Sequence, residues 1–282
     1  MSADSRSHSF GAAGQGLLAS VMSVFRLPND DPRKTLAVAL VLCLVCSTVV
    51  SATAVSLRPL QERKAALALK AEIVKVAGLG SGGLGLDEAF ARIETRLVDL
   101  DSGGFVEGVD ALSYSYRDAA KNPSASTALG GADQAGITRR PDQMPVYLVR
   151  KDGRLETIIL PVYGAGLWST MHGLLALAPD GRTVKALTFY EQRETAGLGS
   201  EVAGESWLAE WPGKVLLDAS GEPVIEVVKG SVDPSAANAE HRVDGLSGAT
   251  LTSNGVTNLM HFWLGHQGYG QFLARVSDRE RS

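Results

Sequence analysis

The sequence predicts an α+β fold, a mostly antiparallel sheet with flanking helices, preceded by one N-terminal transmembrane helix. Three observations support this prediction. Residues 35–57 form an apolar run without a charged residue, three turn signals separate alternating segments after residue 144, and the last segment has an apolar stripe with helical spacing. With 282 residues, 45% of them hydrophobic, the chain is long enough for one sizeable domain besides the membrane segment.

Composition argues against several classes of partner and cofactor. The formal net charge is -4 and no basic run alternates with aromatic residues, so a nucleic-acid partner is not expected. Cys43 and Cys46 have the spacing of a redox pair or half a metal site, but no other soft ligand is near, so both are interpreted as small apolar side chains. His261 and His266 lack the i, i+4 spacing of a helical zinc pair, and no metal site is predicted.

The apolar run at residues 35–57 is long enough to cross a membrane. A helix of this length spans roughly 35 Å, and the bilayer core measures about 30 Å. A cleaved signal peptide is the alternative, but the run is longer than a typical signal core and the leader, residues 1–34, is too long for one. We expect an uncleaved anchor with a cytoplasmic leader. Basic residues flank both ends of the span, so charge alone leaves the topology open.

Residues 58–143 are predicted to be helical or loop, ahead of a domain at residues 144–282. The stretch 60–79 is rich in Ala, Leu, Lys and Glu and stops at Gly78. A second helix is expected to begin at Asp87, cover residues 88–100 and end at the following Ser-Gly-Gly. Residues 105–141 show weak periodicity and are expected to be mostly loop.

The domain is predicted to contain three β-hairpins and a closing helix. Each hairpin has a two-residue turn signal between alternating apolar segments. The turns are Asp152-Gly153, Asp180-Gly181 and Ser220-Gly221. Residues 255–276 then predict one helix, capped by Thr252 or Ser253, whose apolar stripe packs on the sheet. The stripe consists of Val256, Leu259, Met260, Trp263 and Leu264.

The stretch VDGLSGATLTSNGV, residues 243–256, delivers small and hydroxyl-bearing residues to the start of that helix. A helix N-terminus offers unpaired amides and favours a phosphate, and Gly245 and Gly248 would allow close approach of an anion. Simple capping of the helix is the competing interpretation, and the residues alone leave both open. The stretch has neither the Gly-Lys-[Ser/Thr] of a P-loop nor the G-x-S-x-G frame of a serine hydrolase.

Residues 244–250, DGLSGAT, resemble the flavinylation motif D-x-x-[S/T]-G-A-T of membrane redox flavoproteins in all seven positions. The resemblance implies that a flavin transferase attaches FMN through its phosphate to the hydroxyl of Thr250. Asp244 would help the transferase recognise the site, or would be an ordinary turn acid. The remaining residues expected around the cofactor from this stretch are Gly245, Ser247, Gly248, Ala249, Thr252 and Ser253.

Two further stretches resemble the same family. Residues 191–202, EQRETAGLGSEV, are similar to its E-T-[P/A]-G-L-G segment; Ala196 stands where proline is commoner. This likeness implies a wall against the flavin made by Thr195, Gly197, Leu198 and Gly199. Residues 161–173, PVYGAGLWSTMHG, are also similar, with Leu167 and Trp168 packing on the flavin ring or, alternatively, in the protein core.

The arrangement of the whole chain resembles the C-subunit family of sodium-translocating NADH:quinone reductases. Such a chain would carry FMN as a one-electron relay in a respiratory complex that oxidises NADH, reduces ubiquinone and moves Na⁺. Its partners would be the other subunits and, during maturation, the flavin transferase. The resemblance places the flavin domain on the periplasmic side of a bacterial inner membrane.

Two alternatives to this family stay open at the level of sequence. One is the G subunit of ferredoxin:NAD electron-transport complexes, and the other is a membrane-anchored binding module without flavin. No dinucleotide-binding fingerprint and no acid within the span is present, so the chain is expected to be an electron carrier within an enzyme rather than a complete enzyme.

Overall fold

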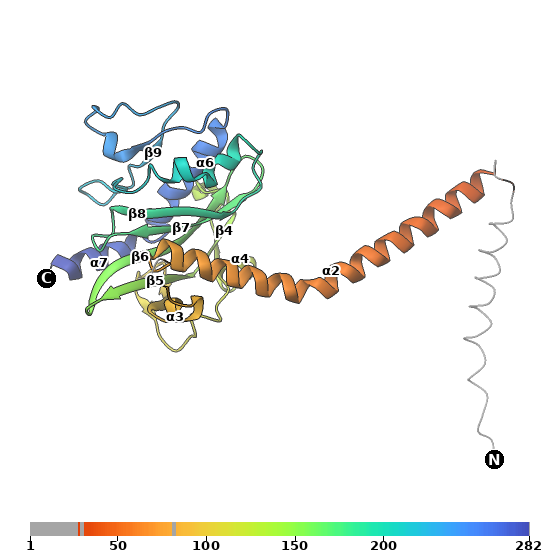
Figure 1. Ribbon diagram of the computed structural model, residues 1–282, viewed down its shortest axis with the longest axis horizontal. Coiled ribbons are helices and arrows are strands. Elements are labelled where there is room, and N and C mark those ends of the chain that lie inside the picture. Colours follow the sequence, from red (N-terminus) through yellow and green to blue (C-terminus); the bar gives the residue numbers. More distant parts are fainter. Residues whose placement is uncertain (1–27, 29–30, 81–82, 282) are drawn as a thin grey trace, which may run out of the picture. The chain divides into compact units, whose positions relative to one another are not determined.

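The computed structural model describes residue 28 and residues 31–80 and 83–281 of the chain. The chain divides into two compact units, Met1–Ala66 and Leu67–Ser282. Nearly all of the expected leader, residues 1–34, lies outside the described residues. Figure 1 shows the long helix α2 (Pro32–Val76), which begins in the first unit and ends in the second.

Helix α2 contains both the predicted span and the predicted helix after it. Within the described part of the chain, α2 is the one helix long and apolar enough to cross a membrane, which supports the anchor. Cys43 and Cys46 are exposed free thiols on it. The helix ends at Val76 and is terminated, as predicted, by Gly78, whose φ of 74° lets the Leu79 N–H donate to the Val74 carbonyl at 3.1 Å.

The second unit is built on a six-stranded sheet in the order β2-β1-β5-β6-β7-β8. All neighbouring strands are antiparallel, which confirms the predicted α+β class. The strands are β1 (Ile93–Asp99), β2 (Phe105–Val106), β5 (Gln143–Lys151), β6 (Arg154–Ala165), β7 (Thr170–Leu177) and β8 (Val184–Glu191).

Two of the three predicted hairpins are confirmed. Asp152 and Gly153 both have left-handed backbone angles, with φ of 52° and 79°, as a type I′ turn between β5 and β6 requires. Between β7 and β8, the Asp180 carboxylate accepts hydrogen bonds from the N–H groups of Arg182 and Thr183, each at 2.9 Å. Side-chain and backbone turn chemistry therefore fixes the register of β5 with β6 and of β7 with β8.

The third predicted hairpin is much shorter than expected. Only a single antiparallel bridge, between Leu217 and Pro223, flanks its turn. The Asp218 carboxylate closes the turn by accepting from Ser220 and Glu222, and the Asp218 and Val224 N–H groups donate across it to the Glu222 and Leu216 carbonyls, each at 2.9 Å. The chain that follows instead forms β9 (Glu226–Val227), which pairs in parallel with β10 (Arg242–Val243).

The predicted helix over residues 88–100 is wrong. Helix α3 covers only Leu86–Phe90, and the chain then enters β1, which pairs with β5 along its whole length. Pairing with β5 satisfies the backbone of β1 and buries Leu97 and Val98, an advantage that local helix propensity does not match. Asp87 is not the cap; it forms an ion pair with Lys70.

Residues 105–141 are mostly loop, as predicted, with short elements between the loops. The elements missed in this stretch are β2, α4 (Tyr116–Lys121), β3 (Ser126–Ala128), β4 (Arg139–Pro141) and the 3-10 turn Gly130–Ala132. Three other short helical segments follow β8. They are the 3-10 turn Gly199–Ala203, α5 (Glu205–Leu208) and the 3-10 turn Ala239–His241.

The closing helix is split in two. Helix α6 (Thr250–Leu264) and helix α7 (Gly270–Arg281) replace the single helix predicted over 255–276. Between them the chain turns so that Tyr269 is fully buried and its hydroxyl donates to the Pro161 carbonyl at 2.8 Å. Burial of this ring accounts for the break.

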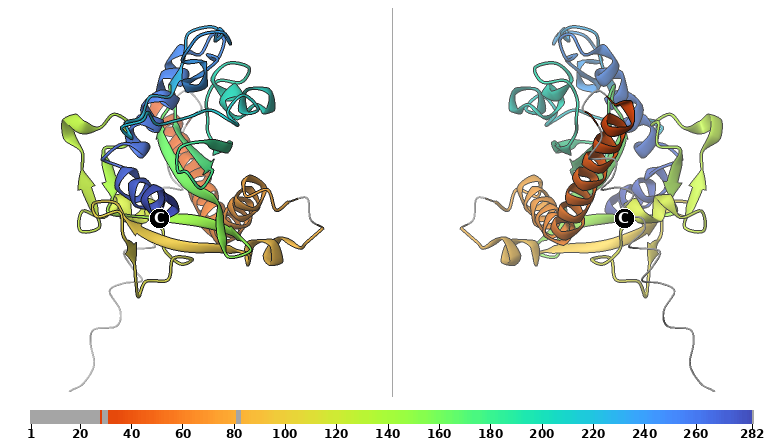
Figure 2. Two further views of the ribbon diagram at one scale, coloured as in Figure 1. Left: turned by 90° about the vertical axis from the view of Figure 1, so that its left-hand side faces the viewer. Right: turned by 90° about the vertical axis from the view of Figure 1, so that its right-hand side faces the viewer.

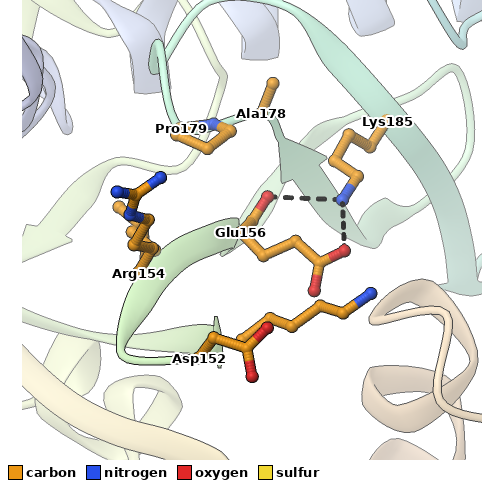
Figure 3. Close-up of a pocket in the computed structure, with 8 residues that line it drawn as sticks. Asp152, Arg154, Glu156, Ala178, Pro179 and Lys185 are labelled. Carbon is orange, nitrogen blue, oxygen red and sulfur yellow. Dashed lines mark hydrogen bonds and ion pairs between the residues drawn. The ribbon is translucent and has the colours of Figure 1, made fainter.

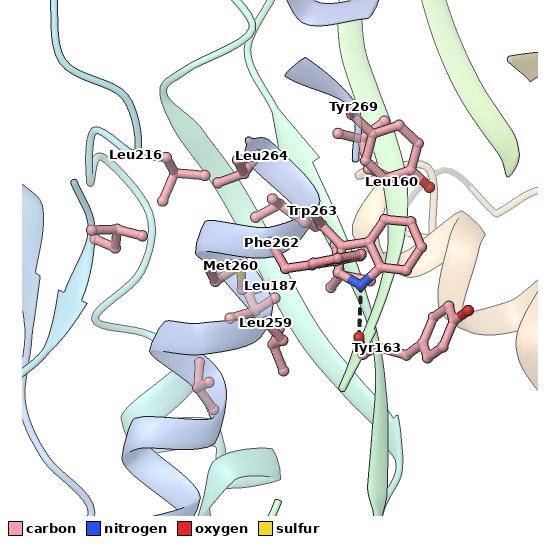
Figure 4. Close-up of a cluster of buried hydrophobic side chains, with 14 of the residues drawn as sticks. Leu160, Tyr163, Leu187, Leu216, Leu259, Met260, Phe262, Trp263, Leu264 and Tyr269 are labelled. Carbon is pink, nitrogen blue, oxygen red and sulfur yellow. Dashed lines mark hydrogen bonds between the residues drawn. The ribbon is translucent and has the colours of Figure 1, made fainter. Parts of the chain in front are cut away.

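The apolar stripe of α6 is buried as predicted, and every member is at most 1% exposed. Figure 4 shows this cluster, with the Trp263 indole N–H donating to the Tyr163 carbonyl of β6. The opposite face of the sheet packs on the last turns of α2 and on α3, through residues such as Ile73 and Ile159. Figure 2 shows helices on both faces of the sheet.

Candidate functional site

Thr250 is the first residue of α6, and its side chain is exposed. The N-cap is Ala249, which makes no side-chain cap hydrogen bond, so the prediction that Thr252 or Ser253 caps the helix is wrong. Because the methyl side chain of Ala249 cannot accept a hydrogen bond, no N-cap side chain pairs with the first backbone amides of α6. Gly248, just before it, is exposed with a left-handed φ of 71°.

The four hydroxyl groups of residues 243–256 fall into two pairs. Thr252 and Ser253 are buried, at 0% and 2% exposure. The Ser253 Oγ accepts a hydrogen bond from the Leu246 N–H at 3.0 Å, and the Thr252 Oγ1 donates to Glu194 Oε2 at 2.9 Å. Ser247 and Thr250 are exposed. Only these two hydroxyls in the stretch are accessible for modification from solvent.

Glu194 is a buried residue at this site that sequence reasoning missed. It follows β8 and is 8% exposed, and its carboxylate accepts hydrogen bonds from the turn between β6 and β7 as well as from Thr252. The donors in the turn are the backbone N–H groups of Leu167, Trp168 and Ser169 and the Ser169 hydroxyl. Its place at the start of E-T-A-G-L-G was the one available signal.

The carboxylate of Glu194 is ionised at neutral pH. Burial by itself would raise its pKa, but the hydrogen bonds from the Trp168 N–H, the Thr252 hydroxyl and the neighbouring turn amides outweigh burial. The net effect is that the pKa of Glu194 lies below its usual value. A charged carboxylate thus links the turn after β6 to the first turn of α6.

Apolar side chains surround this link on the surface. Trp168 is 71% exposed, so its alternative assignment to the core is wrong. Leu167, Leu198 and Leu251 are also exposed. Leu198 lies beside the motif, since a Cβ on Gly248 would be 2.8 Å from its Cδ2. The three stretches predicted to form one site are therefore brought together around the start of α6.

The remaining predicted residues of the E-T-A-G-L-G loop have different positions. Thr195 and Gly197 are exposed; the Thr195 carbonyl accepts from the Leu198 N–H at 3.1 Å, and the Gly197 N–H donates to the Ser200 Oγ at 3.0 Å. Gly199 is buried against Thr252, where an added Cβ would lie 2.7 Å from Oγ1. Contact of these residues with a cofactor stays a prediction.

Asp244 and Gly245 face a neighbouring loop. The Asp244 Oδ1 accepts from the Val232 N–H at 2.8 Å, and a Cβ on Gly245 would lie 2.2 Å from the Val228 carbonyl oxygen. Asp244 lines a hollow with Glu210; burial, and then the Asp244 charge, raise the pKa of Glu210. Asp244 therefore has the bonding of a turn acid, and its recognition by a transferase stays a prediction.

A surface hollow of about 740 Å³ contains none of the predicted site residues. Figure 3 shows that it is lined by the β5–β6 turn and by Pro179 and Lys185, with Lys185 paired to Glu156. It lies at the start of β6 and the end of β7, whereas the site lies at the end of β6 and the start of β7. The two features are at opposite ends of the strands.

Comparison with known proteins gives the class of this site. Residues 166–265 match the family model of the FMN-binding domain. This range includes the turn after β6, the Glu194 loop and the whole of α6. The fold and the site therefore define a class: membrane-anchored proteins with an FMN-binding domain.

Relatives that match most of the chain identify the family. The chain is 50% identical over 257 residues to the C subunit of the Na⁺-translocating NADH-quinone reductase of Pseudomonas aeruginosa, covering 89% of this chain and 98% of that protein. It is 46% identical to the corresponding protein of Yersinia pestis, covering 89% and 95%. The crystal structure of Shewanella oneidensis NqrC superposes with a TM-score of 0.69 at 34% identity, over 74% of this chain and 96% of that one. The chain belongs to the family of Na⁺-translocating NADH-quinone reductase C subunits.

Proposed function

We propose that Thr250 is the attachment point of FMN, through a phosphoester between its hydroxyl and the flavin phosphate. The observation that carries the proposal is the exposure of Thr250 at the start of α6, beside the exposed apolar side chains Leu167, Trp168 and Leu198. Within its family the chain is an FMN-carrying electron-transfer subunit of a Na⁺-translocating NADH-quinone reductase, anchored by α2. The G-subunit alternative and the module without flavin are not favoured by these relatives.

The residues at the site fit such a cofactor. The first turn of α6 presents backbone N–H groups and the positive end of a helix dipole, which stabilise the single negative charge of a phosphodiester. The apolar side chains around it offer a surface for a planar ring system, with the large face of Trp168 exposed for stacking. When bound, FMN supplies one-electron transfer between partners.

The structure of the stretch also favours Thr250 over its neighbours. Attachment replaces the proton of a hydroxyl by the phosphorus of FMN, with loss of the elements of water relative to the free cofactor. Thr252 and Ser253 are buried and bonded within the protein, so a transferase cannot reach them without opening the helix. Ser247 is exposed, but it precedes the helix and lacks the helix amides at its hydroxyl.

The intact mass of the chain from its own host tests the proposal. We expect the wild type to carry one FMN less one water, and Thr250→Ala to carry none. Ser206→Ala, which removes an exposed hydroxyl outside the three stretches of the site, is the matched control that keeps the flavin. A covalent flavin also survives denaturation and fluoresces in a gel band. An unmodified wild-type chain, from a host in which the transferase is present, would reject the covalent link.

The cellular setting is part of the same proposal. The flavin-bearing unit lies on the periplasmic side of a single-pass inner-membrane protein, and works with the other subunits and with ubiquinone as the electron acceptor of the complex. Support comes from the family and from the single candidate span among the described residues. Protease added to intact spheroplasts should digest this unit; protection of the unit would reverse the assigned side.

A further inference from the structure

We infer that Glu194 is the positioning residue of the flavin site. It fixes the turn that carries Leu167 and Trp168 against the first turn of α6, and so sets the place of these side chains relative to Thr250. The effect of Glu194 on flavin attachment rests on the proposed attachment at Thr250. The effect of Glu194 on the turn at residues 167–169 concerns the chain without cofactor and does not.

The two oxygens of the Glu194 carboxylate accept different sets of hydrogen bonds. Oε1 accepts from the Trp168 N–H at 3.0 Å, the Ser169 N–H at 3.1 Å and the Ser169 hydroxyl at 3.2 Å. Oε2 accepts from the Leu167 N–H at 3.1 Å and the Thr252 hydroxyl at 2.9 Å. Oε2 is therefore the atom at which the turn and the helix meet.

These bonds are the compensation for burying a charge. Among the described residues, no basic side chain forms an ion pair with Glu194, so backbone amides and hydroxyls alone balance the carboxylate. Donors to a charged acceptor form stronger bonds than neutral pairs do, and leaving them unpaired in a buried place is costly. Removal of the carboxylate thus frees three consecutive amides at once.

The surrounding backbone is shaped to admit this side chain. A Cβ on Gly166 would lie 2.6 Å from Glu194 Oε1, and a Cβ on Gly199 would lie 2.9 Å from Glu194 Cβ. Both glycines stand in the stretches that carry the apolar side chains of the site. A carboxylate that only capped a surface turn would not need clearance from two separate loops.

The position of Thr252 connects the carboxylate to the attachment point. Thr252 and Thr250 are in the same first turn of α6, and the Thr252 side chain is fully buried with its hydroxyl on Glu194. The hydrogen bond between Thr252 and Glu194 fixes the rotation of the first turn of α6 about the helix axis, and in this orientation Thr250 faces solvent. The same bond engages the Thr252 hydroxyl, which would otherwise compete with Thr250 for modification.

The first arm of the test uses the full chain in detergent without cofactor, made in cells lacking the transferase. Amide hydrogen exchange is compared for wild type, Glu194→Gln, Glu194→Ala and the exposed control Glu201→Gln. In Glu194→Ala the amides of residues 167–169 should exchange about tenfold faster or more, the factor for losing a bond to a charged group. Glu194→Gln keeps one acceptor oxygen, so Trp168 and Ser169 stay protected while Leu167 loses protection.

The second arm measures the rate of FMN attachment by a flavin transferase to the same four proteins. We expect Glu194→Ala to fall about tenfold, Glu194→Gln to recover part of that loss, and Glu201→Gln to match wild type. Thr252→Val, which removes the hydroxyl at nearly constant volume, should lower the rate without exposing the amides of residues 168 and 169. It serves as a second probe if Glu194→Ala does not fold.

The two arms separate failure of this inference from failure of the proposed function. If wild type gains no FMN, the attachment at Thr250 is rejected, while the exchange pattern still decides whether Glu194 holds the turn. If the wild type is flavinylated and every Glu194 and Thr252 variant matches it in rate, the positioning role is overturned. Unchanged exchange at residues 167–169 in Glu194→Ala overturns it as well.

Discussion

Trp263 on α6 and Tyr163 on β6 are joined by a hydrogen bond of 2.6 Å, from the indole N–H to the backbone carbonyl. Their rings are also in contact, with centroids 4.9 Å apart. Nearer the site, a Cβ on Gly255 would lie 2.5 Å from the Ala165 carbonyl oxygen, so the helix and the end of β6 nearly touch there. Helix α6 is thus fixed on β6 near both its ends, and Thr250 is carried by a rigid element.

Trp263→Phe should loosen this contact. The change removes the donor to the Tyr163 carbonyl and leaves a small void, because Trp263 is fully buried. We expect a loss of about 2 kcal/mol in the free energy of unfolding. Denaturant titration of the full chain in detergent measures it. Trp168→Phe is the matched control at an exposed position and should change stability by less than about 0.5 kcal/mol; equal effects would contradict the assigned role of Trp263.

The attachment point should depend on the hydroxyl and not on the shape of the side chain. Thr250→Val keeps the shape of threonine and removes the hydroxyl, so it should lose the flavin completely. Thr250→Ser keeps the hydroxyl and should retain covalent FMN. Fluorescent gel bands and intact mass report both results. Covalent flavin on Thr250→Val would show that another residue is the acceptor.

Part of this architecture was predictable because its determinants are local. The turns at Asp152-Gly153 and Asp180-Gly181 encode two hairpins in the residues themselves, and the stripe of α6 is visible in its spacing. The motif that ends at Thr250 is likewise contiguous. In each case neighbouring residues determine the conformation, and no distant partner is needed.

The rest depends on partners far away in the chain. Strand β1 was mistaken for a helix because its backbone is satisfied by β5, which begins 44 residues after β1 ends. Glu194 was missed for the same reason: its donors at Leu167 and Thr252 are 27 and 58 residues away. The third hairpin stops after one bridge because the residues that follow, β9, pair with β10 instead of with the strand before the turn.

Gly199→Ala should disturb the site more than an ordinary loop substitution does. The added Cβ would lie 2.7 Å from the Thr252 Oγ1 and 2.9 Å from the Glu194 Cβ, both of them buried. We expect a loss of about 1–3 kcal/mol in unfolding free energy, the range for overpacking. Gly131→Ala is the control, since it has open space and no positive φ. A loss at Gly131 as large as that at Gly199 would argue against the close packing of the site.

Stability should fall below neutral pH because of His172. Burial, and then the charge of Arg117, lower the pKa of His172 to about 4, against a smaller opposite effect of Glu191. In the unfolded chain the pKa is about 6.5. Between these values the unfolded state binds a proton that the folded state does not, so the stability present above pH 6.5 is lost as pH falls toward 4. The slope reaches at most about 1.4 kcal/mol per pH unit, less where solvent screens the ring.

His172→Gln isolates this effect from the titration of carboxylates, which both proteins share. The free energy of unfolding of the full chain is measured from pH 7 to pH 4.5, and the difference between wild type and variant is followed. Because glutamine does not titrate, wild type should lose more stability than the variant over this window. The ring of His172 stacks on Tyr163 at 5.3 Å, so the variant will be less stable at pH 7 as well. A difference that stays constant with pH would mean that His172 binds its proton equally well in the folded and unfolded states.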